Sequence, residues 1–184
     1  MIVREDALAL VRERIPNKNL VNHSVAVEII MGALARHLEL SDADIERWEL
    51  AGLLHDLDYA ETAEDFERHG VITVELLGDQ IDQEMAHAIL AHADKAPRDT
   101  LMDKALYAAD PTSGFIVAAA LVRPDKSLAA VEVSSLKKRW KEKAFARGAD
   151  RDQMAACSEI GLERDDFLAI ALTAMQARSG DVGL

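Results

Sequence analysis

The sequence predicts an all-α protein. Apolar residues recur at a spacing of three to four along most of the chain, whereas the alternating Val, Ile and Tyr pattern of strands is nearly absent. Hydrophobic residues make up 49% of the 184 residues but aromatic residues only 4%. The core therefore consists of Ala, Leu, Ile, Val and Met, and Ala and Leu are the best helix formers. The length suits one domain with a substantial core.

The first two thirds of the chain predict a series of helices joined by short turns. The expected spans are, in order, about 4–15, 17–40, 41–55, 63–77 (as one helix or a pair of helices), 83–93, 99–110 and 111–122. The expected N-caps are Asn17 or Asn19, Ser41 together with Asp44, and Asp99 or Thr100. We expect Pro111 to interrupt the helix that reaches Asp110, because proline suits the first turn of a new helix.

The last third, from Ser127, predicts two or three more helices. Residues 134–148 are locally basic, and residues 163–177 form a strongly apolar amphipathic helix that can pack onto the domain or onto a second copy of the chain. A homodimer is therefore an open expectation. We expect residues 179–184 to be a frayed tail.

Charge and cysteine content restrict the classes of partner. The net charge is −12, which repels phosphate polymers and disfavours nucleic acid as a partner, although a bound cation would still attract a small phosphorylated ligand. The lone Cys157 excludes an intramolecular disulfide and a cysteine zinc cluster, and we expect it to fill the core. The charged start of the chain lacks a signal peptide or membrane span, so a cytoplasmic location without a membrane partner is expected.

The segment GLLHDLD gives the sharpest functional clue. His55 and Asp56 stand side by side at the end of an apolar helical run. An aspartate that enters a core is unfavourable unless it is paired or binds a metal. Adjacent residues of a helix point about 100° apart, so the two can hold one ion only near a helix end or bend. The polar residues that follow provide such an end.

Three segments together resemble the HD superfamily of metal-dependent phosphohydrolases. They are NHSVAVEIIMGALARHL, ELAGLLHDLD and MDKALYAADPTSGF, which span roughly residues 20–122. The resemblance implies an HD-domain helical bundle with additional C-terminal helices. We expect a single domain over 1–184, with an HD core at about 18–123 and an extension at about 124–178. The implied ligands are His23, His55, Asp56 and Asp110.

The resemblance also implies a second metal position. HD proteins with two ions add two histidines, which match His69 and His92, and Asp56 would then bridge one or two divalent ions of Fe, Mn, Co, Ni, Mg or Zn. This set is similar to those of HD-type dinucleoside tetraphosphatases and of HD-type di-iron oxygenases. The Gly-rich signatures of cyclic-dinucleotide phosphodiesterases are missing.

Several of these residues have a simpler interpretation. Asp110 before Pro111 suits a helix N-cap, and His23 or His69 alone would be ordinary helix residues. His87 competes with His92, because five positions along a helix separate them by about 140° and they cannot easily face one site.

The predicted activity is hydrolysis of a phosphate ester or anhydride in a small, nucleotide-like substrate. Asp56 would orient a metal-bound hydroxide, and Asp58 is a candidate base or orienter of a ligand. The candidate substrate-binding residues are Lys95, Arg98, Lys104, Thr112 and Ser113. We expect Thr112 and Ser113 to start the helix after Pro111, where free N–H groups could bind an anion. The alternatives are a di-iron oxygenase, which uses the same ligands, and a metal-binding signalling module without turnover.

Overall fold

The computed structural model describes residues 1–184 and contains helices and turns with no strand, which confirms the all-α prediction. The α-helices are α1 (Arg4–Arg14), α2 (Lys18–His37), α3 (Asp42–Leu54), α4 (Tyr59–Thr62), α5 (Val71–Leu77), α6 (Gln83–His92), α7 (Leu101–Leu121), α8 (Val133–Trp140), α9 (Arg151–Ala155) and α10 (Arg164–Ala177). Short 3-10 helices lie at Phe66–Arg68, Gly78–Gln80, Leu128–Ala130, Ala156–Ile160 and Ser179–Val182.

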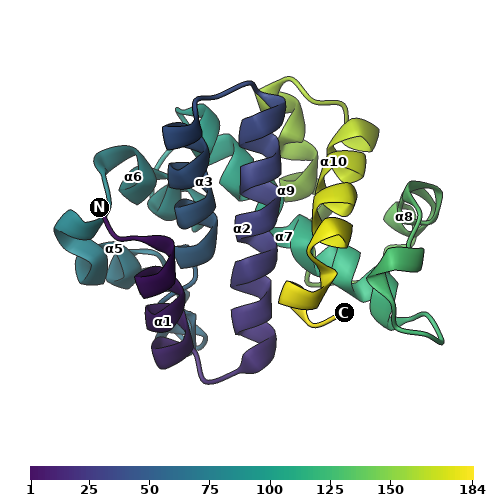
Figure 1. The fold of residues 1–184 in the computed structure, drawn as a ribbon, viewed down its shortest axis with the longest axis horizontal. Helices are drawn as coiled ribbons and strands as arrows, with labels where there is room; N and C mark the ends of the chain where they lie inside the picture. Colours follow the sequence, from purple (N-terminus) through teal and green to yellow (C-terminus); the bar gives the residue numbers. More distant parts are fainter.

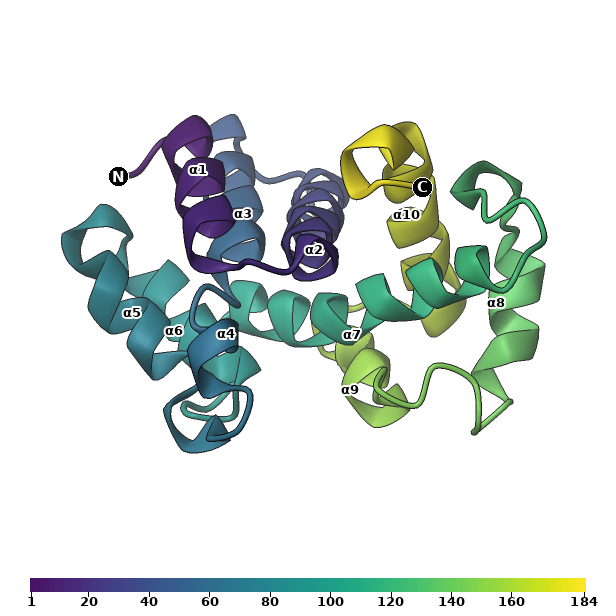
Figure 2. The ribbon, with the colours of Figure 1, turned by 90° about the horizontal axis from the view of Figure 1, so that it is seen from below.

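Helix α2 lies in the middle of the fold. Helices α1 and α3 flank it on one side and α10 on the other (Figure 1). The long α7 runs beneath this layer, from the α5 and α6 end of the molecule to the α8 end (Figure 2). A single cluster of 45 buried residues connects these layers, with members from Ala7 in α1 to Val182 near the C-terminus. No helix combines the length and the apolar character needed to cross a membrane.

Helices α2 and α3 approach closely because α3 carries a glycine at the crossing. A Cβ atom added at Gly52 would lie 2.9 Å from backbone atoms of Val27 and Glu28 in α2. Glu28 is 1% exposed and its carboxylate is paired with Arg4, which ties α1 to the same place. Gly52 is three residues before His55, so this contact also fixes the end of α3 from which His55 projects.

The predicted N-caps are present at three helices. The side chain of Asn17 accepts a hydrogen bond from the backbone N–H of Asn19, and Ser41 accepts one from Asp44. Thr100 and Asp103 form a reciprocal capping box at the start of α7. These caps explain why the starts of α2, α3 and α7 follow from local sequence.

Two expectations about local structure, an interruption at Pro111 and a frayed C-terminus, were wrong. Helix α7 continues through Pro111, because packing against α2, α6 and α9 holds the helix although the proline cannot donate to a carbonyl. The span 63–77 forms two helices, one of the two predicted alternatives: the break lies at His69 and Gly70, and Gly70 has a φ of 76°. Residues 179–184 are not frayed, since they include a 3-10 helix and the buried Val182.

Candidate metal centre

Six side chains from separate parts of the chain converge on one site beside α2 and the end of α3. His23 comes from α2, His55 and Asp56 from the end of α3, His69 from the break before α5, His92 from the last residue of α6, and Asp110 from the middle of α7. We call these six residues the His/Asp cluster. The structure thus brings together all six residues that the sequence predicted as metal ligands.

Asp56 lies at the centre of the cluster. Its Oδ1 atom is 3.4 Å from His55 Nε2, 3.3 Å from His69 Nε2 and 3.5 Å from His92 Nε2. Its Oδ2 atom is 3.4 Å from His23 Nε2. Atoms bound to one metal at about 2.1 Å lie about 3 Å apart or slightly more, so these separations suit ligands of a common ion.

The cluster divides into two groups that share Asp56. His23, His55 and Asp56 offer one set of ligand atoms within 4.8 Å of one another, and Asp56, His69 and His92 offer the other. Asp110 joins the first group, because its Oδ1 atom is 3.1 Å from His23 Nε2 and 3.8 Å from His55 Nε2. The arrangement therefore has room for two ions with Asp56 between them.

Each histidine of the cluster is held by its Nδ1 atom, which leaves Nε2 facing Asp56. His55 Nδ1 lies 2.8 Å from the Gly52 carbonyl oxygen, and His92 Nδ1 bonds the carbonyl oxygen of Ile89. Both acceptors lie three residues earlier, in the last turn of a helix, where carbonyls have no helical partner. These bonds favour the tautomer with a proton on Nδ1 and a free Nε2.

The other two histidines are oriented by side chains. His23 Nδ1 lies 2.8 Å from Ser113 Oγ, and that hydroxyl donates to the Asp110 carbonyl oxygen, so it accepts from the ring. His69 Nδ1 donates to Asp58 Oδ1 at 2.8 Å. Asp58 Oδ2 accepts from the backbone N–H of Thr73. Asp58 is 2% exposed and both of its oxygens are engaged, so it orients His69 and is not placed to act as a base.

The electrostatics of the cluster favour ionised carboxylates. Burial alone would raise the pKa of Asp56, but the electrostatic interaction with the adjacent His55 and the hydrogen bonds from His23 and His69 hold it well below its usual range. The pKa of Asp110 is likewise lowered, because the hydrogen bond and charge of His23 outweigh the effect of burial.

The histidines respond in the opposite direction. Burial lowers the pKa of His23, but hydrogen bonds to Asp110 and Asp56 raise it from 6.5 to about 10. The pKa of His69 rises to about 9, because hydrogen bonds to Asp56 and Asp58 outweigh burial. Without a cation in the cluster, these two imidazoles therefore carry the positive charge that balances the buried carboxylates.

Two ring nitrogens show that the cluster suits a metal. The Nε2 atoms of His55 and His92 are fully buried and have no hydrogen-bond partner. Buried polar atoms are nearly always satisfied, so each such atom needs an explanation. Both atoms point at Asp56 with the tautomer of a metal ligand, and imidazole with carboxylate is a donor set for Zn, Fe, Mn, Co or Ni. The residues present therefore fit divalent ions.

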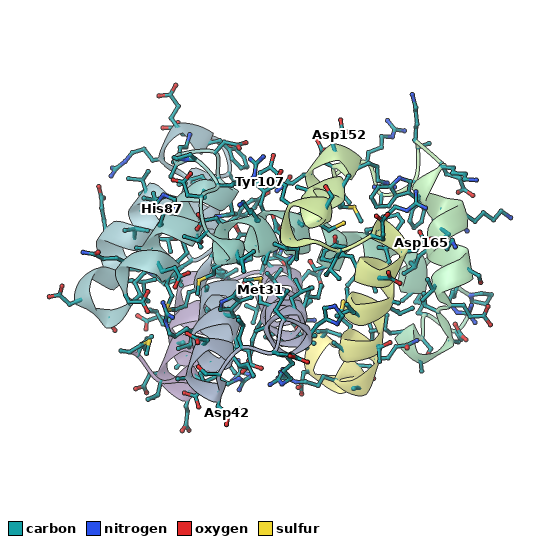
Figure 3. All side chains as sticks on the ribbon, turned by 90° about the horizontal axis from the view of Figure 1, so that it is seen from above. Met31, Asp42, His87, Tyr107, Asp152 and Asp165 are labelled. Carbon is teal, nitrogen blue, oxygen red and sulfur yellow. The ribbon has the colours of Figure 1, made fainter.

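His87 does not belong to the cluster. Its Nδ1 atom pairs with Asp103 Oδ2 at 3.0 Å, beside the capping box of α7. His87 lies in α6, and its label stands to the left of Met31 in Figure 3. The structure thus places His92, and not His87, with the other five residues.

The predicted phosphate-binding residues are not gathered at the cluster. Lys95 is exposed just beyond α6. Arg98 pairs with Asp94 and Glu159, and its guanidinium lies 4.0 Å from the centre of the Tyr107 ring. Neither of these residues nor Lys104 lines the two cavities that border His23. Their contact with substrate stays a prediction.

The prediction of an anion site at Thr112 and Ser113 was wrong. It required a helix to begin after Pro111, whereas α7 continues through that position and its N–H groups are used within the helix. Thr112 is fully buried and donates its hydroxyl to the Ala108 carbonyl oxygen. Ser113 is also buried and orients His23, a role that the sequence alone did not reveal because it depends on a contact across 90 residues.

Two cavities reach the cluster from the side of α7. One has a volume of about 280 Å³ and is lined by His23, Asp110, Gly114 and the loop 146–149. The other has a volume of about 480 Å³ and lies between α2, α7 and residues 182–184, with His23 again in its wall. The C-terminal third therefore supplies part of the wall of each cavity.

The loop 146–149 is held in place by Arg151. The guanidinium donates to the carbonyl oxygens of Phe145, Ala146 and Ala149 and lies 4.3 Å from the centre of the Phe115 ring. Ala146 has a φ of 45°, which a non-glycine residue rarely adopts. Arg151 thus stabilises a strained loop next to the cluster.

Comparison with known proteins agrees with this geometry. The family model of the HD domain matches residues 20–120, a range that contains the whole His/Asp cluster. The chain belongs to the HD domain family. Its HD domain is 31% identical over 99 residues to ribonuclease Y of Nitratidesulfovibrio vulgaris, and 33% identical over the same length to ribonuclease Y of Geobacter metallireducens.

These relatives are much longer proteins. The match covers 53% of this chain but only 18% of each ribonuclease Y, so the similarity concerns the HD domain alone. No solved structure matches the chain. The segment after residue 120, which forms part of the wall of each cavity, lies outside the family match.

Proposed function

We propose that this protein is a metal-dependent phosphohydrolase that acts on a small phosphate ester or anhydride, such as a nucleotide. The observation that carries the proposal is the pair of ligand groups that share Asp56. Members of the HD superfamily, to which the chain belongs, are generally metal-dependent phosphohydrolases. When bound, divalent ions lower the pKa of a coordinated water and neutralise charge on phosphoryl oxygens.

The residues of the chain would each contribute a defined part. His23, His55 and Asp110 would hold one ion, His69 and His92 the other, and Asp56 would bind both. Asp58 and Ser113 would keep His69 and His23 in the ligand tautomer through Nδ1. Burial of the cluster limits the access of bulk water, which strengthens every charge interaction with a bound phosphate.

The size of the substrate is argued from charge and shape. A net charge of −12 disfavours an RNA polymer, although the relatives are named ribonucleases. The cavities at His23 have volumes of about 280 and 480 Å³, which is the range of small-molecule sites. Small phosphorylated metabolites therefore fit this proposal better than a polymer does.

A substrate screen tests the proposal. The protein would be loaded with Mn²⁺, Co²⁺, Ni²⁺ or Fe²⁺ and offered nucleotides, sugar phosphates and a single-stranded RNA, with release of phosphate or new ends as the readout. Replacing Asp56 by alanine should abolish turnover. The control is His37→Ala, because His37 is exposed at the end of α2 and outside the cluster. Retained turnover in the Asp56 variant would refute the assigned site.

The same screen separates hydrolysis from oxygen chemistry. The iron-loaded protein would also be monitored for substrate-dependent consumption of oxygen. Consumption of oxygen together with no hydrolysis of any phosphate would overturn the hydrolase proposal in favour of a di-iron oxygenase.

A further inference from the structure

Three glycines lie inside long helices, and one of them has no packing reason to be there. A Cβ atom at Gly32 would meet the side chain of Glu49 at 2.3 Å, and one at Gly52 would meet the backbone of α2. A Cβ atom at Gly114 would meet nothing within 4 Å. Glycine inside a helix is about 1 kcal/mol less favourable than alanine, so α7 is weaker at Gly114 for no gain in packing.

Gly114 borders both cavities at the cluster. It is four residues after Asp110, so it lies about one turn along the same face of α7. It lines the 280 Å³ cavity together with His23 and Asp110, and the 480 Å³ cavity together with His23 and Ser113. The missing side chain therefore leaves open space at a position that both cavities share with the ligand His23.

The larger cavity has a mainly apolar lining that includes a few polar side chains. Its hydrophobic residues are Leu20, Val117, Leu121, Val182 and Leu184. Asn19 and Asn22 add amide groups, and His23 and Ser113 mark the end nearest the cluster. No Lys, Arg, Asp or Glu is among the lining residues. A cavity of this kind suits an uncharged ring with hydrogen-bonding edges, and offers nothing to a second phosphate group.

The wall contributed by the C-terminal segment is fixed to the rest of the fold. Val182 is 3% exposed, and Arg178 lies 3.8 Å from the buried carboxylate of Glu28. Gly183 has a φ of 76°, and the amide nitrogen of Asn22 lies 2.8 Å from the place where its Cβ would be. The segment thus packs directly against the start of α2, and the cavity is a built feature.

We propose that this apolar cavity, opened by Gly114 and walled by residues 182–184, binds the uncharged aromatic or heteroaromatic part of the substrate while the metal ions bind its phosphate. The inference rests on the proposed function and adds a specificity site whose wall is completed by residues 182–184, outside the family match. It predicts selection of monophosphates of ring-containing alcohols over substrates with a second anionic group.

Two non-hydrolysable probes separate the ring from the phosphate. Methylphosphonate and benzylphosphonate carry the same anionic head, and only the second carries a ring. Binding of each to the Mn²⁺-loaded protein would be measured by calorimetry. We expect benzylphosphonate to bind about tenfold more tightly or better, since even a methylene in an apolar pocket changes affinity by about 10-fold or more.

Variants then assign the difference to the cavity. Gly114→Leu should remove the advantage of benzylphosphonate over methylphosphonate, because the new side chain occupies the space that the ring would need. Leu121→Asn, at a position that is 49% exposed and thus tolerant for folding, should reduce the advantage as well. The control is Thr173→Leu, which adds the same side chain at an exposed position of α10, a helix that lines neither cavity.

The outcomes distinguish the two proposals. Equal binding of the two phosphonates, or an advantage that survives in both cavity variants, would overturn the cavity inference alone. Binding of neither phosphonate to the metal-loaded protein would overturn the proposed function and the inference with it. Loss of the advantage in Thr173→Leu would also count against the cavity.

Discussion

Replacing Gly52 by alanine probes the contact that positions His55. The new Cβ atom would lie 2.9 Å from backbone atoms of Glu28 and Val27, which cannot move aside as a side chain can. Overpacking of a core typically destabilises by about 1–3 kcal/mol, and this contact belongs at the upper end. Alanine returns about 1 kcal/mol through its helix propensity. The expected net loss of unfolding free energy is therefore about 2 kcal/mol.

The assay is urea unfolding of the metal-free protein, followed by circular dichroism, because a bound ion would add its own binding energy. For a domain of this size the loss corresponds to a fall in Tm of roughly 4–8 °C. Gly114→Ala is the matched control. Its Cβ meets no atom, so the same change should raise stability by about 1 kcal/mol. If both variants were more stable than the wild type, the close approach of α2 and α3 would be refuted.

Three further predictions concern the surroundings of the cluster. Asp58→Asn should weaken the binding of one of two ions by about 10–100-fold, because His69 loses its orienting carboxylate. The affinities would be measured by competition with a chelator. If the variant bound both ions as tightly as the wild type does, this role of Asp58 would be contradicted. The pKa values of His23 and His69 are raised from 6.5 to about 10 and about 9, so their contribution to the stability of the metal-free protein should be complete below pH 6.5 and lost as the pH rises through 9 to 10. For the same reason, metal binding at pH 7.5 should release protons. Calorimetry in buffers of different ionisation enthalpy would detect this release. Binding without proton release would rule this out. Arg151→Met should lower the free energy of unfolding in urea by about 2 kcal/mol, because it removes charged hydrogen bonds to three carbonyls. An unchanged midpoint of urea unfolding would show that the loop 146–149 does not depend on Arg151.

Local sequence was sufficient where local interactions decide the structure. The caps at Asn17, Ser41 and Thr100 involve partners within three residues, and the structure shows all three. The residues of the His/Asp cluster were predicted from the HD motif, and the structure brings them together. The orientation of His55 and His92 is also a local feature: the Nδ1 atom of each ring bonds the backbone carbonyl oxygen three residues earlier, at the end of a helix.

Contacts between distant segments decided the rest. Pro111 signals a helix boundary locally, but α7 is packed along its length and continues. Ser113 orients His23 from 90 residues away, and no local pattern announces that pairing. The C-terminal residues 179–184 were predicted to be a frayed tail, yet residues 182–184 form a cavity wall because they pack against the start of α2. Tertiary packing overrides local propensity at each of these places.

The central claim is that Asp56 joins two metal positions in one site. The direct measurement is metal content by mass spectrometry together with electron paramagnetic resonance of the Mn²⁺-loaded protein. We predict two ions per chain with an exchange-coupled signal, and loss of the coupling in Asp56→Ala. A single ion per chain, or two ions whose signals show no coupling in the wild type, would contradict the claim.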